Sequence, residues 1–308
     1  MIAPQVSVSS PWYNGSIASL PSYLGLTWPS CCEPGEALAV VGTVYGSAVA
    51  GVWSGRNISA DYIKLYAAES GIVWNNPVGF GGAVIPTFWY SMINQYFVLS
   101  TLDLLKLDPA HRIKSAAAVS WAQASQAMGG AFNHTGFNFS AMRPIDNGLW
   151  TEGDVAGGVA WLGVVAAQVL SGDAQNLALR MARVALSFLE AQIKSPLYEC
   201  LMPLGALAAA RMNAEHGGEY NVTRLLSWSL SDGNNQYRQG WGMLDAEWGP
   251  RGAQLDIGGL IGSITDGGGY AFAGNSLWFM AILVCTISFA GNGIVVTDTC
   301  ASSFHVPF

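Results

Sequence analysis

Charged side chains are scarce in this chain. Asp, Glu, Lys and Arg make up 11% of its 308 residues, whereas hydrophobic residues make up 51%, and soluble domains ordinarily carry about a quarter charged residues. The 13 Lys and Arg form no basic run, and the 20 Asp and Glu give a net charge of −7. Because phosphate backbones are bound by clustered positive charge, we expect no nucleic-acid partner. So little charge requires either a large interior or a membrane.

Long uninterrupted hydrophobic runs are also absent. Most apolar stretches end after about 12–18 residues at a charged residue, whereas a membrane-spanning helix needs about 20 apolar residues. The best spanning candidate is Leu277–Val296, and Gly291, Asn292 and Gly293 interrupt it. Buried helices of a globular domain therefore fit the pattern better, and a membrane protein is the less favoured alternative.

Residues for metal and nucleotide chemistry are few. The chain has four His and five Cys, and no cysteine spacing resembles a metal site. No phosphate loop, nucleophile elbow or EF-hand motif is found. We therefore expect no metal and no cofactor. The neighbouring Cys31 and Cys32 leave their disulfide state open, because adjacent cysteines bond to each other only in a strained turn.

Signals for cellular location are mixed. Met1–Ser10 has neither a positive segment nor a continuous apolar segment, so we expect no signal peptide in this sequence. Sequons of the Asn-x-Ser/Thr type exceed the roughly two expected by chance, which indicates a secreted glycoprotein; ordinary loop tripeptides are the equal alternative. These sequons begin at Asn14, Asn57, Asn133, Asn138 and Asn221.

What the chain has is a recurring pair of helices. Each unit opens with a Gly-rich loop carrying acidic or aromatic residues, continues into an apolar helix and ends with a helix that has one polar face. The units begin roughly 50–75 residues apart, which is typical of stacked supersecondary units. The expected helices are Thr87–Leu105 and Ala110–Met128, Glu152–Leu170 and Gln175–Ile193, and Glu199–Met212 and Tyr220–Leu230, followed by a further apolar helix at Tyr270–Leu283.

Other segments complete the predicted organisation. We expect an irregular N-terminal segment at residues 1–35 and one helical domain at residues 36–285. Residues 286–308 lack the polar-faced helix that the pattern requires, so we expect a truncated chain or an unnatural continuation. Further expectations are a helix at Ala60–Ser70, a long loop at Gly129–Leu149, and a Gly-rich region at Ser231–Gly269 with short strands such as Gly242–Glu247.

The alternation of the helices indicates a closed ring. Helices that are apolar all round suit an inner ring, and helices with one polar face suit an outer ring that meets water. Three motifs open the inner helices: Trp150-Thr151-Glu152-Gly153-Asp154, Tyr198-Glu199-Cys200-Leu201 and Thr265-Asp266-Gly267-Gly268-Gly269-Tyr270. On these motifs the chain resembles the six-hairpin glycosidase-like (α/α) toroid superfamily. The resemblance implies an all-α fold, here an incomplete toroid with long Gly-rich loops. An open α-solenoid is the alternative.

The resemblance also implies a sugar site where loops enter the inner helices, and glycoside hydrolysis of a poly- or oligosaccharide as the function. Aromatic faces and carboxyls suit such a site, and inversion needs two carboxyls roughly 6.5–9.5 Å apart. We favour Glu152 paired with Asp245 or Glu247, and the simpler alternative is that Glu152 and Asp154 cap their own helix. The candidate catalytic residues are Glu152, Glu199, Asp245, Glu247 and Asp266, and the candidate sugar-binding residues are Trp74, Trp150, Tyr198, Tyr237, Trp241, Trp248 and Tyr270.

Two further functions stay open. A polysaccharide lyase acting on uronates needs a base and groups that neutralise the uronate carboxylate. His134 lies inside the Asn133 sequon and is therefore expected to be exposed, which disfavours it as that base. The third function is a non-catalytic scaffold. The lyase candidates are His134, Arg143, Asn147, Tyr237, Arg238 and Tyr270.

Overall fold

The computed structural model describes residues 65–74, 86–199 and 201–230, together with Tyr45 and the backbone of residues 241–244, 261–263 and 270–271. Most of these residues are helical, in agreement with the expected all-α class. The chain divides into two compact units. The first unit includes residues 65–74 and 90–120, and the second includes residues 87–89 and the described residues from Trp121 onward. No helix within the described ranges has both the length and the apolar character needed to cross a membrane.

The first unit contains a short antiparallel hairpin and parts of two helices. Strands β1 (Tyr66–Ala67) and β2 (Ile72–Val73) pair with each other, and the helices are α3 (Phe88–Leu104) and α4 (Arg112–Ala127). The Gln95 side chain bonds both the N–H and the carbonyl of Val73, at 3.2 and 2.6 Å. The helix expected at Ala60–Ser70 is therefore wrong from residue 66 onward. Gly71 has a φ of +71°, which favours a tight turn there over a continuing helix.

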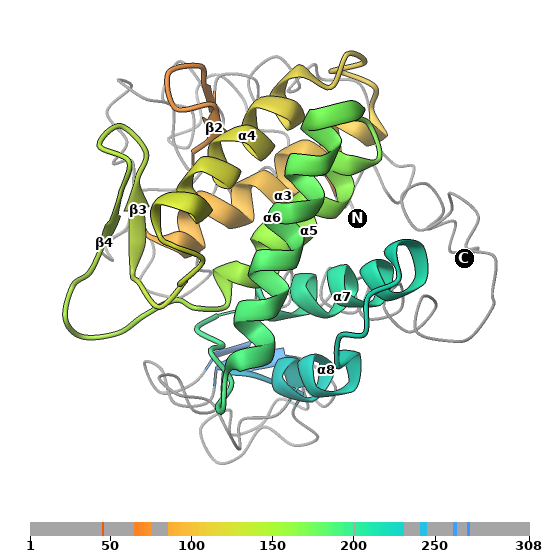
Figure 1. The fold of residues 1–308 in the computed structure, drawn as a ribbon. Coiled ribbons are helices and arrows are strands. Elements are labelled where there is room, and N and C mark those ends of the chain that lie inside the picture. Colours follow the sequence, from red (N-terminus) through yellow and green to blue (C-terminus); the bar gives the residue numbers. More distant parts are fainter. Residues whose placement is uncertain are drawn as a thin grey trace. The chain divides into compact units, whose positions relative to one another are not determined.

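The second unit is built on two helical hairpins. Helix α5 (Val155–Ala167) packs against α6 (Gly172–Ala191) and α7 (Met202–His216), and α7 packs against α8 (Val222–Leu230). Figure 1 shows α6 lying along α5, and α8 beside α7. All four helices lie within a few residues of their predicted positions, because the periodicity of their apolar residues is strong.

The two kinds of helix differ as the sequence pattern predicts. Every residue of α5 except Val165 is buried, whereas α6 buries one face only. Glycine allows the close approach of α5 and α7. A Cβ added at Gly157 would lie 2.6 Å from the Leu201 carbonyl oxygen and 2.9 Å from the Gly205 nitrogen. The glycine content of the apolar helices therefore serves their packing.

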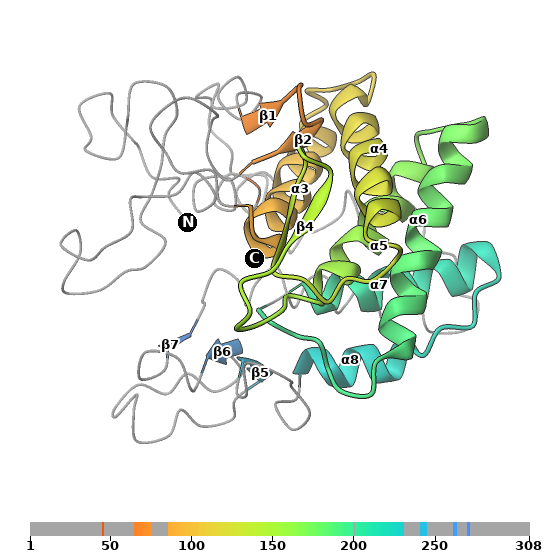
Figure 2. The same ribbon diagram turned by 60° about the vertical axis from the view of Figure 1, so that its left-hand side comes forward.

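A second hairpin lies within the segment expected to be a loop at Gly129–Leu149. Strand β3 (Gly136–Asn138) pairs antiparallel with β4 (Arg143–Ile145), and Figure 2 shows this hairpin. Phe137 is fully buried, and its ring meets that of Phe139 edge to face at 5.0 Å. The loop expectation is wrong here, because buried aromatic side chains anchor the strand pairing.

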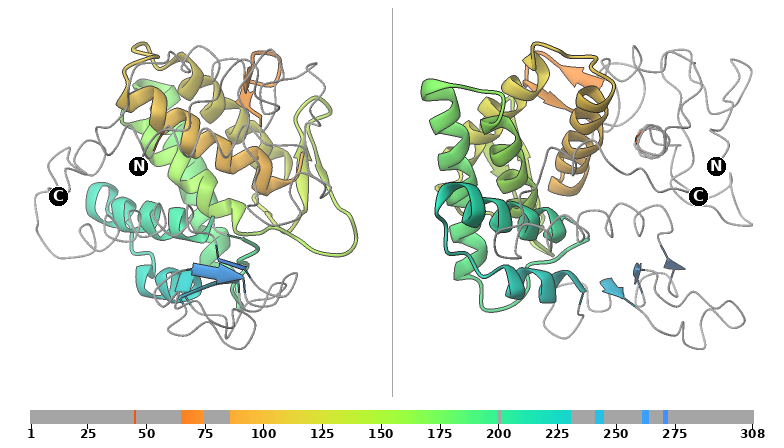
Figure 3. Two further views of the ribbon diagram at one scale, coloured as in Figure 1. Left: turned by 180° about the vertical axis from the view of Figure 1, so that it is seen from behind. Right: turned by 90° about the vertical axis from the view of Figure 1, so that its right-hand side faces the viewer.

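Three short strands follow α8. Strands β5 (Trp241–Leu244), β6 (Ile261–Ser263) and β7 (Tyr270–Ala271) form an antiparallel sheet in the order β5-β6-β7. Figure 3 shows β5 following α8, and α7 and α8 side by side. The expected short strand near Gly242–Glu247 is confirmed in part, whereas the helix expected from Tyr270 is wrong at its first two residues, which pair with β6. The predicted terminal segments, residues 1–35 and 286–308, lie outside the described residues.

Candidate functional site

The starts of three helices are tied together by one loop, the segment that leads into α5. The Glu152 carboxylate accepts a hydrogen bond from the backbone N–H of Trp89, in the first turn of α3, at 2.6 Å. The Asp154 carboxylate accepts hydrogen bonds from the N–H groups of Glu199 and Leu201, just before α7, both at 3.3 Å. First-turn N–H groups lack partners within their own helix. Each carboxylate thus accepts hydrogen bonds from N–H groups at the start of a neighbouring helix.

Asp154 does not cap its own helix through its side chain. It occupies the N-cap position of α5, yet its carboxylate makes no capping hydrogen bond to α5. The simpler expectation for Asp154 is therefore wrong in its detail. The carboxylate instead accepts hydrogen bonds from two N–H groups of the segment before α7.

An aromatic pair lies beside these carboxyls. The rings of Trp150 and Tyr198 are parallel within 8°, with centroids 6.0 Å apart. The Trp150 indole N–H donates to Glu152 at 3.3 Å, which fixes the orientation of the ring. Tyr198 is buried, whereas Trp150 is half-buried and keeps part of its surface open to solvent. We name Trp150, Glu152, Asp154, Tyr198 and Glu199 the helix-start cluster.

The two buried carboxyls differ from Glu199 in their access to water. Glu152 is 2% exposed and Asp154 1% exposed, whereas Glu199 is half-buried. Burial raises the pKa of Asp154 from 3.8 to about 6, although hydrogen bonds from the N–H groups of Tyr198, Glu199 and Leu201 oppose the rise. Asp154 therefore takes up a proton just below neutral pH.

The loop before the cluster is fastened to the base of the β3–β4 hairpin. The N–H of Glu152 donates to the His134 carbonyl oxygen at 2.8 Å. The Thr135 hydroxyl donates to the Trp150 carbonyl oxygen at 2.9 Å, and the Trp150 N–H donates to the Asn147 side chain at 3.1 Å. Backbone and side chain of Trp150 are both held, so its ring is presented in a fixed position.

A histidine–carboxylate pair lies at the same hairpin base. His134 Nδ1 is 2.9 and 3.1 Å from the two carboxylate oxygens of Asp146. The His134 side chain is 21% exposed, so the expectation of an exposed histidine is wrong. Sequence reasoning did not single out Asp146, because only the pairing of β3 with β4 brings residues 134 and 146 together.

Of the remaining sugar-binding and catalytic candidates, the structure describes the side chain of Trp74 alone. Trp74 belongs to the first unit and is 7% exposed, with its indole N–H donating to the Ser70 hydroxyl at 3.1 Å. Trp241 and Tyr270 begin strands β5 and β7, of which only the backbone is described. The pairing of Glu152 with Asp245 or Glu247 stays a prediction. Tyr237, Asp245, Glu247, Trp248 and Asp266 all lie outside the described residues.

Metal ligands and related proteins give no further guide to the site. Within the described ranges, no group of three or more His, Cys, Asp and Glu side chains is placed to hold a metal ion. No protein-family model, curated protein or solved structure matches the chain.

Proposed function

We propose that the protein binds and cleaves glycans at the helix-start cluster, with glycoside hydrolysis as the reaction. The supporting observation is the parallel Trp150–Tyr198 pair, fixed in position by two buried carboxyls. Trp150 keeps part of its ring surface open, and an aromatic surface oriented by hydrogen bonds suits the apolar face of a sugar ring. The sequons favour action outside the cell.

The alternation of helices supports the ring architecture within this proposal. Helices α5 and α7 are buried over most of their length, and α6 and α8 bury one face. In an α/α toroid the first pair would belong to the inner ring and the second pair to the outer ring. The helix-start cluster would then lie where loops enter the inner ring.

The carboxyls of the cluster divide into two roles in this proposal. Glu152 and Asp154 are positioning residues, because their oxygens hold the Trp150 indole and the backbone before α7. Glu199 is half-buried and is the carboxyl that a substrate can reach. Hydrolysis with inversion needs one carboxyl to protonate the leaving oxygen and a second to activate water. Asp245, Glu247 and Asp266 are the candidates for the second carboxyl.

Binding is tested separately from chemistry. The protein is titrated with soluble cello-, xylo-, chito-, malto- and galacturono-oligosaccharides, and binding is followed by calorimetry. Trp150→Ala is expected to abolish the binding of any oligosaccharide that the protein takes. Leu149→Ala, at a neighbouring side chain that is 76% exposed, is the matched control and is expected to bind normally. Equal binding by the two variants, or no binding by the unchanged protein, would refute the proposed site.

Turnover is tested with Glu199→Gln, which keeps the size of the side chain and removes its charge. Loss of a catalytic carboxyl lowers kcat by at least about 100-fold, while oligosaccharide affinity is expected to stay within about threefold because the Trp150 contact is kept. New reducing ends are measured by colorimetry, and their anomeric form by NMR. Unchanged kcat would exclude Glu199 as a catalytic residue.

Elimination from a uronate is a second candidate, favoured by the His134–Asp146 pair. A carboxylate on Nδ1 leaves Nε2 as the proton acceptor and stabilises the imidazolium that forms. His134 would take the C5 proton, the C4–O bond would break, a C4–C5 double bond would form, and the leaving oxygen would gain a proton. Ultraviolet absorbance of the unsaturated product distinguishes this reaction from hydrolysis. His134→Gln is expected to abolish elimination, whereas hydrolysis depends on Glu199.

A further inference from the structure

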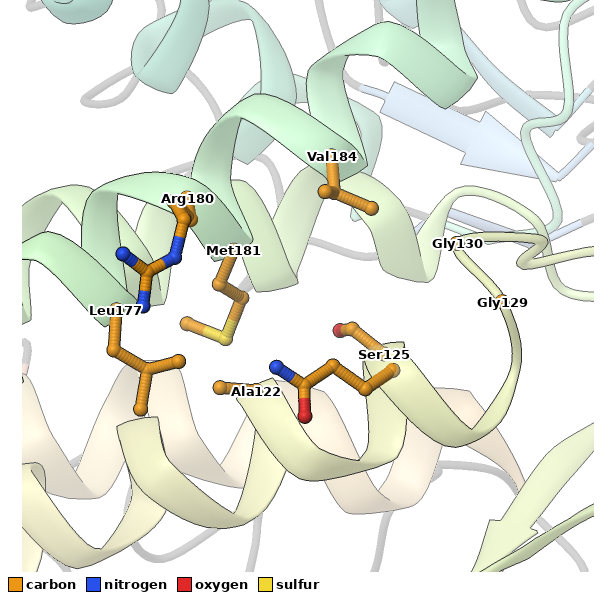
Figure 4. Close-up of a pocket in the computed structure, with 9 residues that line it drawn as sticks. Ala122, Ser125, Gly129, Gly130, Leu177, Arg180, Met181 and Val184 are labelled. Atoms are coloured by element: carbon orange, nitrogen blue, oxygen red, sulfur yellow. The ribbon is translucent and has the colours of Figure 1, made fainter.

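Helices α4 and α6 leave a groove between them that the helix-start cluster does not use (Figure 4). The groove has a volume of about 270 Å³. Its floor is formed by buried Ala122, Ser125 and Met181, and Val184 on its edge is 42% exposed. The remaining lining residues are Gln126, Gly129, Gly130, Leu177 and Arg180. The groove is therefore mostly apolar, with a few polar groups at its rim.

Small side chains and a glycine turn keep this groove open. Ala122 and Ser125 carry little bulk, and the Ser125 hydroxyl donates to the Trp121 carbonyl oxygen at 2.8 Å rather than into the groove. Gly129 and Gly130 have φ values of +62° and +77°. A Cβ at Gly130 would lie 2.9 Å from a methyl group of Val184. A larger residue at this turn would press on the groove's edge.

Positive charge lies along one side of the groove. Arg180 lines it and is exposed, and within the described part of the chain it has no acidic partner. Figure 4 shows its guanidinium group near Leu177. Arg183 follows one turn later on α6. The acidic residues of α6, Asp173 and Glu190, lie near its ends, and Glu190 pairs with Arg224 of α8 at 3.2 Å. The middle of α6 is thus a positive stretch in a protein of net charge −7.

We propose that this groove binds a free, medium-chain carboxylate, with its head group on Arg180 and its chain along Met181 and Ala122 toward Gly129. A planar guanidinium matches a carboxylate in shape and charge. The volume lies below the range of about 300–1,000 Å³ that is typical of drug-sized ligands. One unbranched chain fits such a space.

A chain-length series tests the apolar part of the site. Hexanoate, octanoate and decanoate are titrated into the intact chain below their micelle concentrations, and the Met181 methyl resonance is followed by NMR after assignment with Met181→Leu. The dissociation constant is expected to fall up to about fourfold for each added buried methylene, and to level off when the groove is filled. Octylammonium, with the opposite charge, is expected to leave the resonance unchanged.

Variants at exposed positions test the head group and the groove's edge without disturbing the core. Arg180→Gln is expected to weaken octanoate binding about fivefold, and Arg183→Gln, its neighbour outside the lining, is expected to leave it unchanged. Val184→Glu is expected to abolish binding, whereas Val169→Glu, at a comparably exposed valine outside the groove, is not.

The proposal is overturned if decanoate leaves the Met181 resonance unmoved, if octylammonium binds as tightly as octanoate, or if both arginine variants behave alike. Trp150→Ala is expected to bind octanoate normally. This result separates the groove from the glycan site, so that failure of either proposal is recognised without the other.

Discussion

Asp154→Asn is expected to remove a pH-dependent loss of stability. The pKa of Asp154 is about 6 in the folded protein, against a usual value of 3.8, because the side chain is buried. Between these two pH values the folded state holds more proton than the unfolded state, so rising pH destabilises the fold. The interval of 6 − 3.8 pKa units corresponds to about 3 kcal/mol, at about 1.4 kcal/mol per unit.

The direction of the effect follows from this order of pKa values. The contribution of Asp154 to stability is fully present below pH 3.8 and is lost as the pH rises through about 6. Asparagine stays neutral throughout, so it does not respond to pH. Its carbonyl oxygen can still accept the N–H groups of Glu199 and Leu201. The free energy of unfolding of the unchanged protein, relative to Asp154→Asn, should therefore fall by about 3 kcal/mol between about pH 3 and about pH 7.

Urea denaturation followed by circular dichroism measures this difference, and other titrating groups cancel because both proteins carry them. Asp173→Asn, at an exposed position in the first turn of α6, is the control for changing an aspartate at a helix start. It is expected to change the free energy of unfolding at neutral pH by less than about 1 kcal/mol. A difference between the unchanged protein and Asp154→Asn that stays flat, or rises with pH, would refute the reasoning.

Other substitutions probe the contacts that hold the second unit. Glu152→Ala leaves buried N–H donors unpaired and should cost about 2–4 kcal/mol, with a changed near-ultraviolet dichroism signal from Trp150. Gly157→Ala places a methyl 2.6 Å from a backbone oxygen before α7, and should cost about 1–3 kcal/mol in urea denaturation; no loss would mean looser packing. Asn213 bonds the N–H and carbonyl of Tyr220 at 2.8 and 2.9 Å, so Asn213→Ala should lower the melting temperature by several degrees; an unchanged value would contradict this.

The sequence predicted the helices of the second unit well, for a physical reason. A helix that is apolar all round is expected to be buried on all sides, and a helix with one polar face is expected to be buried on one side. The structure shows the first arrangement for α5 and the second for α6. The two hairpins at residues 66–73 and 136–145 were not predicted. Each depends on long-range contacts, such as Gln95 with Val73, that leave no periodic signal in a short segment.

Four of the candidate residues lie together in the structure, and their contacts could not be predicted from the sequence. Trp150, Glu152, Tyr198 and Glu199 were singled out because they precede apolar helices, and the structure places them in one cluster. That Asp154 reaches the segment before α7 could not be read from the sequence, because local spacing favours capping of its own helix.

The most direct test of the central account is the indole N–H resonance of Trp150, observed by NMR while the oligosaccharides are added. We predict that the oligosaccharide the protein binds shifts this resonance, and that the indole resonance of Trp161, buried in α5, moves little. A bound oligosaccharide that leaves the Trp150 resonance in place would contradict the account.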